Sequence, residues 1–150
     1  ASGLIETSEI ERAISPAAVP ELSGAAVQGQ ERIMVVDDSL IARELLTSIV
    51  ESYGYEVIAA SSGVDALRQL KKDPCDLVIT DISMPVMDGF ELTARIKGEA
   101  RLKHIPVIIV SAQEDAAARE KGVAVGADAF IPKGAFEQRN LMNTIREYLA

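Results

Sequence analysis

The stretch DLVITDISMPVMDGFEL, residues 76–92, decides how this chain folds. Its first part, residues 76–80, is rich in apolar and β-branched side chains, which predicts a short buried strand. Asp81 follows this strand, and a segment with apolar residues at helical spacing begins at Phe90 after a loop with proline and glycine. Ligands of open parallel sheets bind beyond the carboxyl ends of the strands, so Asp81 lies where chemistry is expected.

The same pattern repeats on both sides of this stretch. Short apolar runs predict strands at IMVV (33–36), YEVIA (55–59), DLVIT (76–80), PVIIV (106–110) and ADAFI (127–131). The segments that follow them carry apolar residues at helical spacing and predict helices over 40–53, 64–72, 90–97, 114–123 and 137–149. Because strands and helices alternate strictly, the sequence predicts an α/β fold, a doubly wound (βα)5 parallel sheet with helices on both faces.

The beginning of the chain differs in composition from the rest. Residues 15–30, SPAAVPELSGAAVQGQ, are rich in Ala, Ser, Pro and Gly and show no sustained periodicity. We interpret residues 1–30 as a linker or N-terminal extension and residues 31–150 as one globular domain. The first residue is Ala1 rather than Met, which predicts that the chain is a piece of a longer protein.

Composition and charge exclude several classes of protein. The net charge of −8 argues against a nucleic-acid partner, because phosphate backbones are held by clustered Lys and Arg. The longest apolar run, residues 105–110, is far too short to span a membrane. Cys75 is the single cysteine, so no internal disulfide forms, and the N-terminal stretch does not resemble a signal peptide. We therefore expect a cytoplasmic protein without nucleic-acid or membrane partners.

Polar side chains follow four of the five predicted strands. Asp37 and Asp38 follow the first strand, Asp81 the third and Ser111 the fourth, while Lys133 comes shortly after the fifth. Taken singly, an Asp pair or a Ser after a strand also suits the N-cap of a following helix, and a lone Lys suits the surface. Together, these groups at one edge of a sheet predict a functional site.

The carboxylates of this edge predict a Mg²⁺ site. Three carboxylates repel each other unless a cation or proton neutralises them, and a set of oxygen ligands suits Mg²⁺. We assign Asp38 and Asp81 as direct ligands, Asp37 as a partner through water, and the backbone carbonyl of Ser83 as a further ligand. No His or Cys ligand is needed.

A carboxylate next to a divalent cation is a nucleophile toward phosphorus, and its product is an acyl phosphate. We assign this role to Asp81. The transferred group carries charge on three equatorial oxygens, and each needs a partner. Mg²⁺ contacts one oxygen, Lys133 a second, and the Ser111 hydroxyl a third.

Four motifs occur in a fixed order: VVDDS (35–39), the stretch 76–92, PVIIVSA (106–112) and ADAFIPK (127–133). With these motifs, residues 31–150 resemble the receiver (CheY-like) domain of two-component response regulators. The resemblance implies a flavodoxin-like five-stranded sheet with strand order 2-1-3-4-5.

The resemblance also implies a role for each site residue. It makes Asp81 the phosphoacceptor and gives the other positions the roles of acidic pocket (Asp37, Asp38) and phosphoryl contacts (Ser111, Lys133). It adds Phe130 as an aromatic switch residue that turns inward when Ser111 moves toward the phosphoryl group, whereas composition alone favours a core residue there. One departure from the family is Gly134, which stands where a proline usually follows the lysine.

The function implied by the resemblance is a phosphorylation-activated signalling switch with no enzymatic activity beyond its own phosphorylation and dephosphorylation. A histidine kinase, in cis or in trans, donates the phosphoryl group. A downstream signalling protein reads the change at the face formed by the fourth helix, the fifth strand and the fifth helix. Residues 133–149 are similar to receivers fused behind chemotaxis-type histidine kinases, which predicts the C-terminal receiver of a hybrid kinase in a chemotaxis or motility pathway.

Two alternatives remain open at this point. A Mg²⁺-dependent phosphohydrolase also uses an aspartyl phosphate, although such enzymes usually need a second Asp two residues after the nucleophile, where this chain has Ser83. A receiver-like scaffold that is never phosphorylated is the other alternative, and the intact set of site residues argues against it.

Overall fold

The computed structural model describes residues 31–112, 116–132 and 138–149. In chain order, the elements are β2 (Arg32–Val36), α1 (Leu40–Ser52), β3 (Glu56–Ala60), α2 (Gly63–Lys72), β4 (Leu77–Thr80), α3 (Gly89–Lys97), β5 (Val107–Ser111), α4 (Ala116–Ala124), β6 (Ala129–Pro132) and α5 (Gln138–Leu149). Every predicted strand and helix has a counterpart within a few residues. The predicted extension, residues 1–30, lies outside the described residues, so its role stays a prediction.

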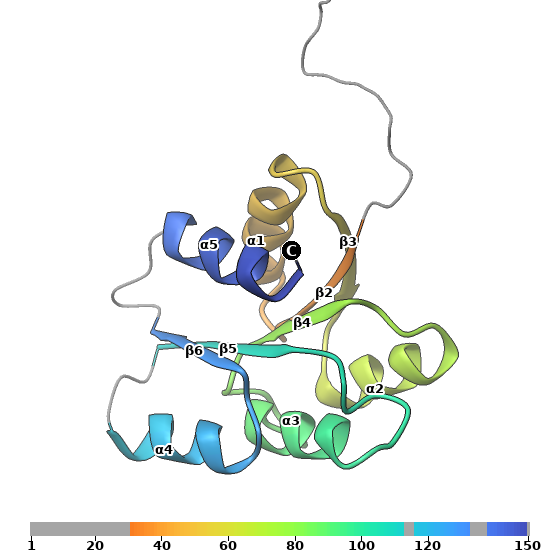
Figure 1. Cartoon of the computed structure of the whole chain (residues 1–150), viewed down its shortest axis with the longest axis vertical. Coiled ribbons are helices and arrows are strands. Elements are labelled where there is room, and N and C mark those ends of the chain that lie inside the picture. The colour runs from red at the N-terminus through yellow and green to blue at the C-terminus, as the bar shows by residue number, and fades with distance from the viewer. Residues whose placement is uncertain (1–30, 113–115, 133–137, 150) are drawn as a thin grey trace, which may run out of the picture. The chain divides into compact units, whose positions relative to one another are not determined.

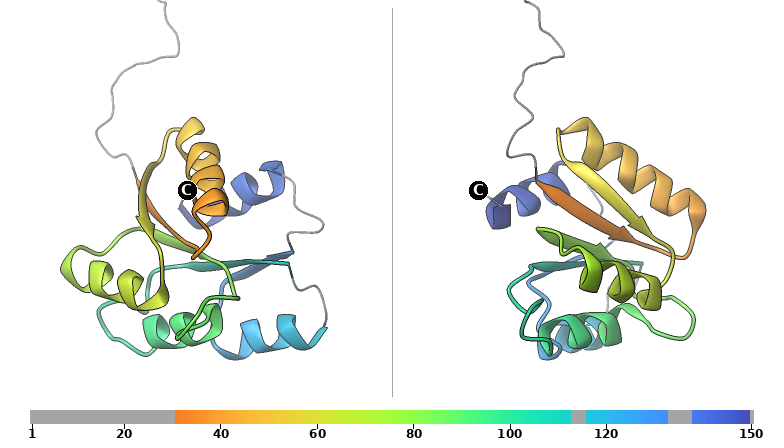
Figure 2. Two further views of the ribbon diagram at one scale, coloured as in Figure 1. Left: turned by 180° about the vertical axis from the view of Figure 1, so that it is seen from behind. Right: turned by 90° about the vertical axis from the view of Figure 1, so that its right-hand side faces the viewer.

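The strands form one parallel sheet in the order β3-β2-β4-β5-β6. Numbered from Arg32, this is the order 2-1-3-4-5, so the predicted fold class and strand order are confirmed. Figures 1 and 2 show α1 and α5 on one face of the sheet and α2, α3 and α4 on the other. The arrangement follows from right-handed crossovers, which place each connecting helix on a face of the sheet.

The central strands are buried on both faces, which explains why their sequences are apolar without alternation. In β2, Ile33 and Val35 face the core under α1 and α5, whereas Met34 and Val36 face the core under α2 and α3. A strand that is buried on only one face would have polar residues at every second position. The two-sided burial makes the carboxyl ends of these strands rigid.

The helices differ in how they are held. Helix α5 buries Leu141, Met142 and Ile145, which have no exposed surface. The buried residues of α4 are both small, namely Ala118 and Gly122. Burial of apolar area contributes about 25 cal/mol per Å², so α4 gains much less from its contact with the sheet than α5 does.

Three helices that start at the carboxyl edge of the sheet have side-chain N-caps. The Ser39 hydroxyl accepts from the Ala42 N–H at 3.3 Å, and the Asp88 carboxylate accepts from the Glu91 N–H at 2.8 Å. Ser62 caps α2 in the same way. An N-cap contributes about 1 kcal/mol and fixes where a helix begins. These caps therefore fix the loops that surround the strand ends.

Within the described ranges, every helix is too short or too polar to cross a lipid bilayer.

We expect Ile145→Ala to lower the free energy of unfolding by about 2–5 kcal/mol, because it removes a buried side chain between α5 and the sheet. The exposed Asn143 on the same helix provides a matched control, and Asn143→Ala should change the free energy of unfolding by less than about 0.5 kcal/mol. Urea unfolding followed by circular dichroism measures both. Equal effects of the two substitutions would contradict the packing described for α5.

Candidate functional site

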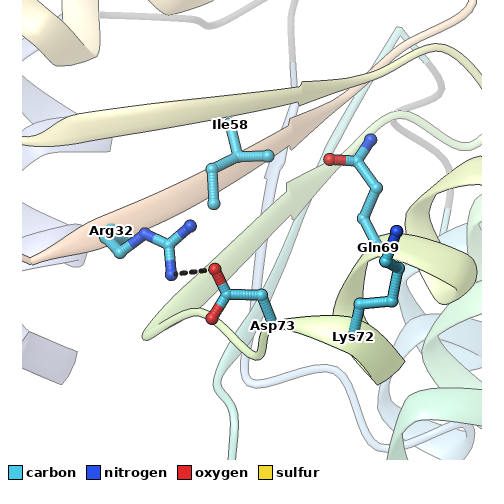
Figure 3. A pocket seen from close by; sticks show the side chains of 5 residues that line it. All are labelled: Arg32, Ile58, Gln69, Lys72 and Asp73. Atoms are coloured by element: carbon cyan, nitrogen blue, oxygen red, sulfur yellow. Dashed lines mark ion pairs between the residues drawn. The ribbon is translucent and has the colours of Figure 1, made fainter.

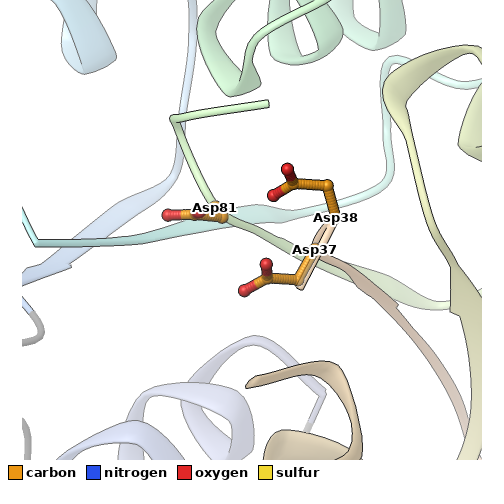
Figure 4. Close-up of side chains that lie close together, drawn as sticks. All are labelled: Asp37, Asp38 and Asp81. Carbon is orange, nitrogen blue, oxygen red and sulfur yellow. The ribbon is translucent and has the colours of Figure 1, made fainter. Parts of the chain in front are cut away.

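Three carboxylates meet at the carboxyl edge of the sheet. Asp37, Asp38 and Asp81 each offer a carboxylate oxygen, and these oxygens lie within 4.8 Å of one another (Figure 4). Asp37 is buried, Asp81 is half-buried and Asp38 is exposed. The cluster is therefore closed to solvent at Asp37 and open to solvent at Asp38. The structure brings together the three acidic residues that the sequence singles out, while their chemical roles stay predictions.

The register of the central strands explains why these residues meet. β2 and β4 are adjacent, and Val36 pairs with Thr80, so the next residue of each strand, Asp37 or Asp81, lies at the same level. The Asp81 N–H donates to the Val36 carbonyl at 3.1 Å, and the Asp37 N–H donates to the Ala60 carbonyl at 3.2 Å. Backbone hydrogen bonds thus hold both acidic residues at the strand ends.

Asp37 is fixed further by its own neighbours. Its Oδ1 accepts from the Ser39 N–H at 2.9 Å, and its backbone carbonyl accepts from the Arg43 guanidinium at 2.8 Å. Arg43 lies in the first turns of α1 and brings a positive charge to the rim of the cluster. Sequence reasoning missed this residue. Its position one helical turn after the N-cap Ser39 is the signal that would have found it.

Asp81 is supported from below by a buried hydroxyl and a glycine. The Thr80 hydroxyl, fully buried, donates to the Asp81 backbone carbonyl at 2.9 Å. The N-terminus of α3 packs directly on this carbonyl: a Cβ atom at Gly89 would overlap the Asp81 oxygen and would lie 3.0 Å from Ile82 Cα. Gly89 thus lets the backbone of α3 approach the strand end closely, and the sequence did not predict the role of Thr80.

We expect Gly89→Ala to destabilise the protein by about 1–3 kcal/mol, because the new methyl group meets rigid backbone atoms of the strand end. The substitution should also displace Asp81 from the other two carboxylates. Urea unfolding measures the first effect. A variant with an unchanged unfolding midpoint would show that α3 does not press on the Asp81 backbone.

The loop between Asp81 and α3 contains a strained residue. Val86 has a φ of 71°, and the Met87 N–H donates to the Pro85 carbonyl at 2.8 Å, which together match the strained form of the γ-turn. A β-branched residue is unfavourable at positive φ. Val86 is 93% exposed, while Met84 and Met87 on either side of it are buried in the core. The two methionines anchor the loop and force the turn between them.

We expect Val86→Gly to raise the free energy of unfolding by about 1 kcal/mol, because relief of a strained φ outweighs the added flexibility of the unfolded chain. Val86→Ala retains a Cβ atom and should give a smaller gain. Thermal unfolding of the two variants measures the order of the effects. Destabilisation by both substitutions would mean that the loop is not strained at this position.

The remaining predicted site residues have different outcomes. Ser111 is buried, with 1% of its surface exposed, at the end of β5. Ser83 is exposed, and the role of its carbonyl as a ligand stays a prediction. Phe130 is half-buried and packs against a small core with Phe90 and Ile109. Lys133 and Gly134 lie outside the described residues, so their predicted roles and geometry remain predictions.

The donor set of the cluster fits Mg²⁺. The available atoms are all carboxylate oxygens, the ligand type that hard divalent cations prefer. Three like charges at this separation repel one another strongly in a partly buried setting. Asp38 and Asp81, on the more open side, are the residues that would hold the ion together with water.

A separate pocket lies at the opposite edge of the sheet (Figure 3). It is lined by side chains from β2, β3 and the end of α2, namely Arg32, Ile58, Gln69, Lys72 and Asp73. Arg32 forms an ion pair with Asp73 at 2.9 Å. Because Arg32 starts β2 whereas Asp37 follows its end, this pocket takes no part in the carboxylate cluster.

Comparison with known proteins identifies relatives of the whole globular part. Residues 33–146 match the family described as the response regulator receiver domain. The chain is 31% identical over 118 residues to protein PilG of Pseudomonas aeruginosa, an alignment that covers 79% of this chain and 87% of that protein. It is 38% identical over 103 residues to the gliding motility regulatory protein of Myxococcus xanthus. This alignment covers 69% of this chain and 13% of that protein.

The fold also matches solved structures. The chemotaxis protein CheY4 of Vibrio cholerae superimposes with a TM-score of 0.74 at 29% identity, covering 79% of this chain and 98% of that chain. Since this chain spans only about an eighth of the Myxococcus protein, nothing about the rest of that protein transfers to it directly.

Proposed function

Because the chain belongs to the response regulator receiver domain family, we propose that it is a signalling switch in which Asp81 accepts a phosphoryl group in the presence of Mg²⁺. The proposal rests on one observation above all, the carboxylate oxygens of Asp37, Asp38 and Asp81 within 4.8 Å of one another. A cation site and a nucleophile are thereby combined in one cluster.

The proposed reaction is a phosphoryl transfer from a phosphohistidine of a kinase. An Asp81 carboxylate oxygen forms a bond to phosphorus, the nitrogen–phosphorus bond of the donor breaks, and the histidine nitrogen keeps the electron pair and takes up a proton. Asp81 suits this role because its backbone is fixed by Val36, Thr80 and Gly89 while its side chain remains half-buried at the open side of the cluster. A fixed nucleophile reduces the entropy lost on the way to the transition state.

Asp38 and Asp81 would hold the metal directly and Asp37 through water, with the Ser83 carbonyl as a further ligand. When bound, Mg²⁺ neutralises part of the carboxylate charge and coordinates an oxygen of the transferred group. The Ser111 hydroxyl and Lys133 contact the other phosphoryl oxygens in this proposal. The hydrogen bond from Arg43 to the Asp37 backbone carbonyl holds the backbone of this residue in place while the charge of the site changes.

The signal leaves the site through Ser111 and Phe130. In our proposal, Ser111 moves toward the phosphoryl group and the Phe130 ring turns inward, which changes the surface of α4, β6 and α5. Phosphorylation shifts an equilibrium between two such states. The partners are a histidine kinase, in cis or in trans, and a downstream signalling protein, and we place the reaction in the cytoplasm.

The names of the relatives support a chemotaxis or motility pathway, since one is a gliding motility regulator and a structural neighbour is a chemotaxis protein. Placement as the C-terminal receiver of a hybrid kinase is part of the same proposal. Family membership favours the switch over the alternative phosphohydrolase, which needs an acid at position 83, where Ser83 stands.

We expect incubation with Mg²⁺ and radiolabelled acetyl phosphate to label the protein, and Asp81→Asn to abolish the label, because the amide is a poor nucleophile. The exposed Asp73 at the opposite edge of the sheet is a matched control, and Asp73→Asn should label like the wild type. Chelation of the metal with EDTA should also prevent labelling. Detection of the acyl phosphate by gel autoradiography measures all of these outcomes.

Undiminished labelling of Asp81→Asn would exclude Asp81 as the acceptor. Steady release of phosphate from added phosphomonoesters, at many turnovers per protein, would instead revive the phosphohydrolase.

A further inference from the structure

Helix α4 is held to β6 and to α3 by unusual contacts. Its buried residues, Ala118 and Gly122, have almost no side chain to pack. Two cations on this helix instead lie over aromatic rings: the Arg119 guanidinium is 5.2 Å from the centre of the Phe130 ring, and the Lys121 ammonium is 5.0 Å from that of Phe90. Both distances are within the range of cation–π attraction.

The Phe130 ring is bounded by α4 on two sides. A Cβ atom at Gly122 would lie 3.2 Å from Phe130 Cδ2, a tight contact, so the glycine lets the ring lie close against the helix. Arg119, one turn earlier on the helix, contacts the ring face. The Phe130 ring therefore lies half-buried between the backbone at Gly122, which has no side chain, and the guanidinium of Arg119.

This place is connected to the carboxylate edge through the sheet. In the parallel register of β5 and β6, Ile109 pairs with Phe130 and Ser111 pairs with Pro132. Because side chains alternate along a strand, Ser111 and Phe130 face the same side of the sheet, toward α4. A ring that turns inward moves along this face toward Ser111, and it must then leave the Arg119 guanidinium.

We propose that Arg119 is a positioning residue that holds the Phe130 ring in its half-buried place and thereby opposes the switch. This inference rests on the proposed function, because it assigns a direction to the movement of Phe130. A contact made in one state and lost in the other biases the equilibrium by its own strength. The exposed position of Arg119 makes the contact weak, and a cation–π pair of that kind changes such an equilibrium about two- to fivefold.

The sign of the effect separates this mechanism from general electrostatics. Loss of a positive charge near an anion site weakens anion binding, whereas loss of the Arg119 contact should strengthen it by freeing the ring. A titration with beryllofluoride, an anionic mimic of the phosphoryl group, in excess Mg²⁺ therefore tests the proposal. The exposed Arg101, which precedes β5 at the opposite edge of the sheet, offers a control with the same change of charge.

We expect Arg119→Gln to lower the beryllofluoride midpoint about two- to fivefold relative to the wild type, with Arg119→Lys in between and Arg101→Gln unchanged. Incorporated 4-fluorophenylalanine, with the Phe130 resonance assigned from Phe130→Leu, reports the ring directly by fluorine NMR. In Arg119→Gln, this resonance should shift before any beryllofluoride is added. Urea unfolding checks that both glutamine variants remain folded.

An Arg119→Gln midpoint that equals or exceeds that of the wild type would overturn the inference, as would an equal decrease in Arg101→Gln. These results are distinct from failure of the proposed function, in which the wild type itself shows no spectral change with beryllofluoride and Mg²⁺. In that case, an unshifted Phe130 resonance in Arg119→Gln would also overturn the positioning role.

Discussion

Mutual repulsion among three carboxylates is the constraint on which the rest of this structure depends. Oxygens of Asp37, Asp38 and Asp81 within 4.8 Å of one another would move apart if their backbone were free. The scaffold prevents this because β2 and β4 are buried on both faces and paired in fixed register. Contacts beneath the cluster, from Thr80 and Gly89, act in the same direction. Rigidity at the strand ends is therefore a requirement of the site.

Short-range rules were sufficient to predict a parallel sheet and the carboxylate cluster, whereas the order of the strands came from the family resemblance. Apolar runs of four to five residues indicate buried parallel strands, and the carboxyl ends of such strands share one edge. Asp81 could be singled out because it directly follows such a strand. The residues that were missed act through side-chain hydrogen bonds to backbone carbonyls, which the sequence pattern does not reveal. Arg43 reaches the Asp37 carbonyl, and Thr80 donates to the backbone of its own successor.

Conformation also escaped prediction where tertiary packing overrides local preference. Nothing in the propensity of valine indicates the positive φ of Val86, which follows from the burial of the methionines on both sides of it. Phe130 illustrates the same difficulty, since composition favours a core residue whereas the structure leaves the ring half-buried beside α4. The sequence gives no reason for a glycine at position 122, whereas the structure offers one, because a Cβ atom there would lie 3.2 Å from Phe130 Cδ2.

Helices α4 and α5 differ in packing, and this difference suggests how a rigid site can be combined with a helix that moves. Helix α5 is fixed to the sheet by large side chains without exposed surface, so we expect it to keep its position. Helix α4 has small buried residues and surface cations over two rings, contacts that are weak singly and easily exchanged. Closely packed cores resist rearrangement, whereas a cation–π contact at the surface is weak and is lost at little cost. If Asp81 is phosphorylated as we propose, we expect α4 to respond more readily than α5, because the buried residues of α4 are only Ala118 and Gly122.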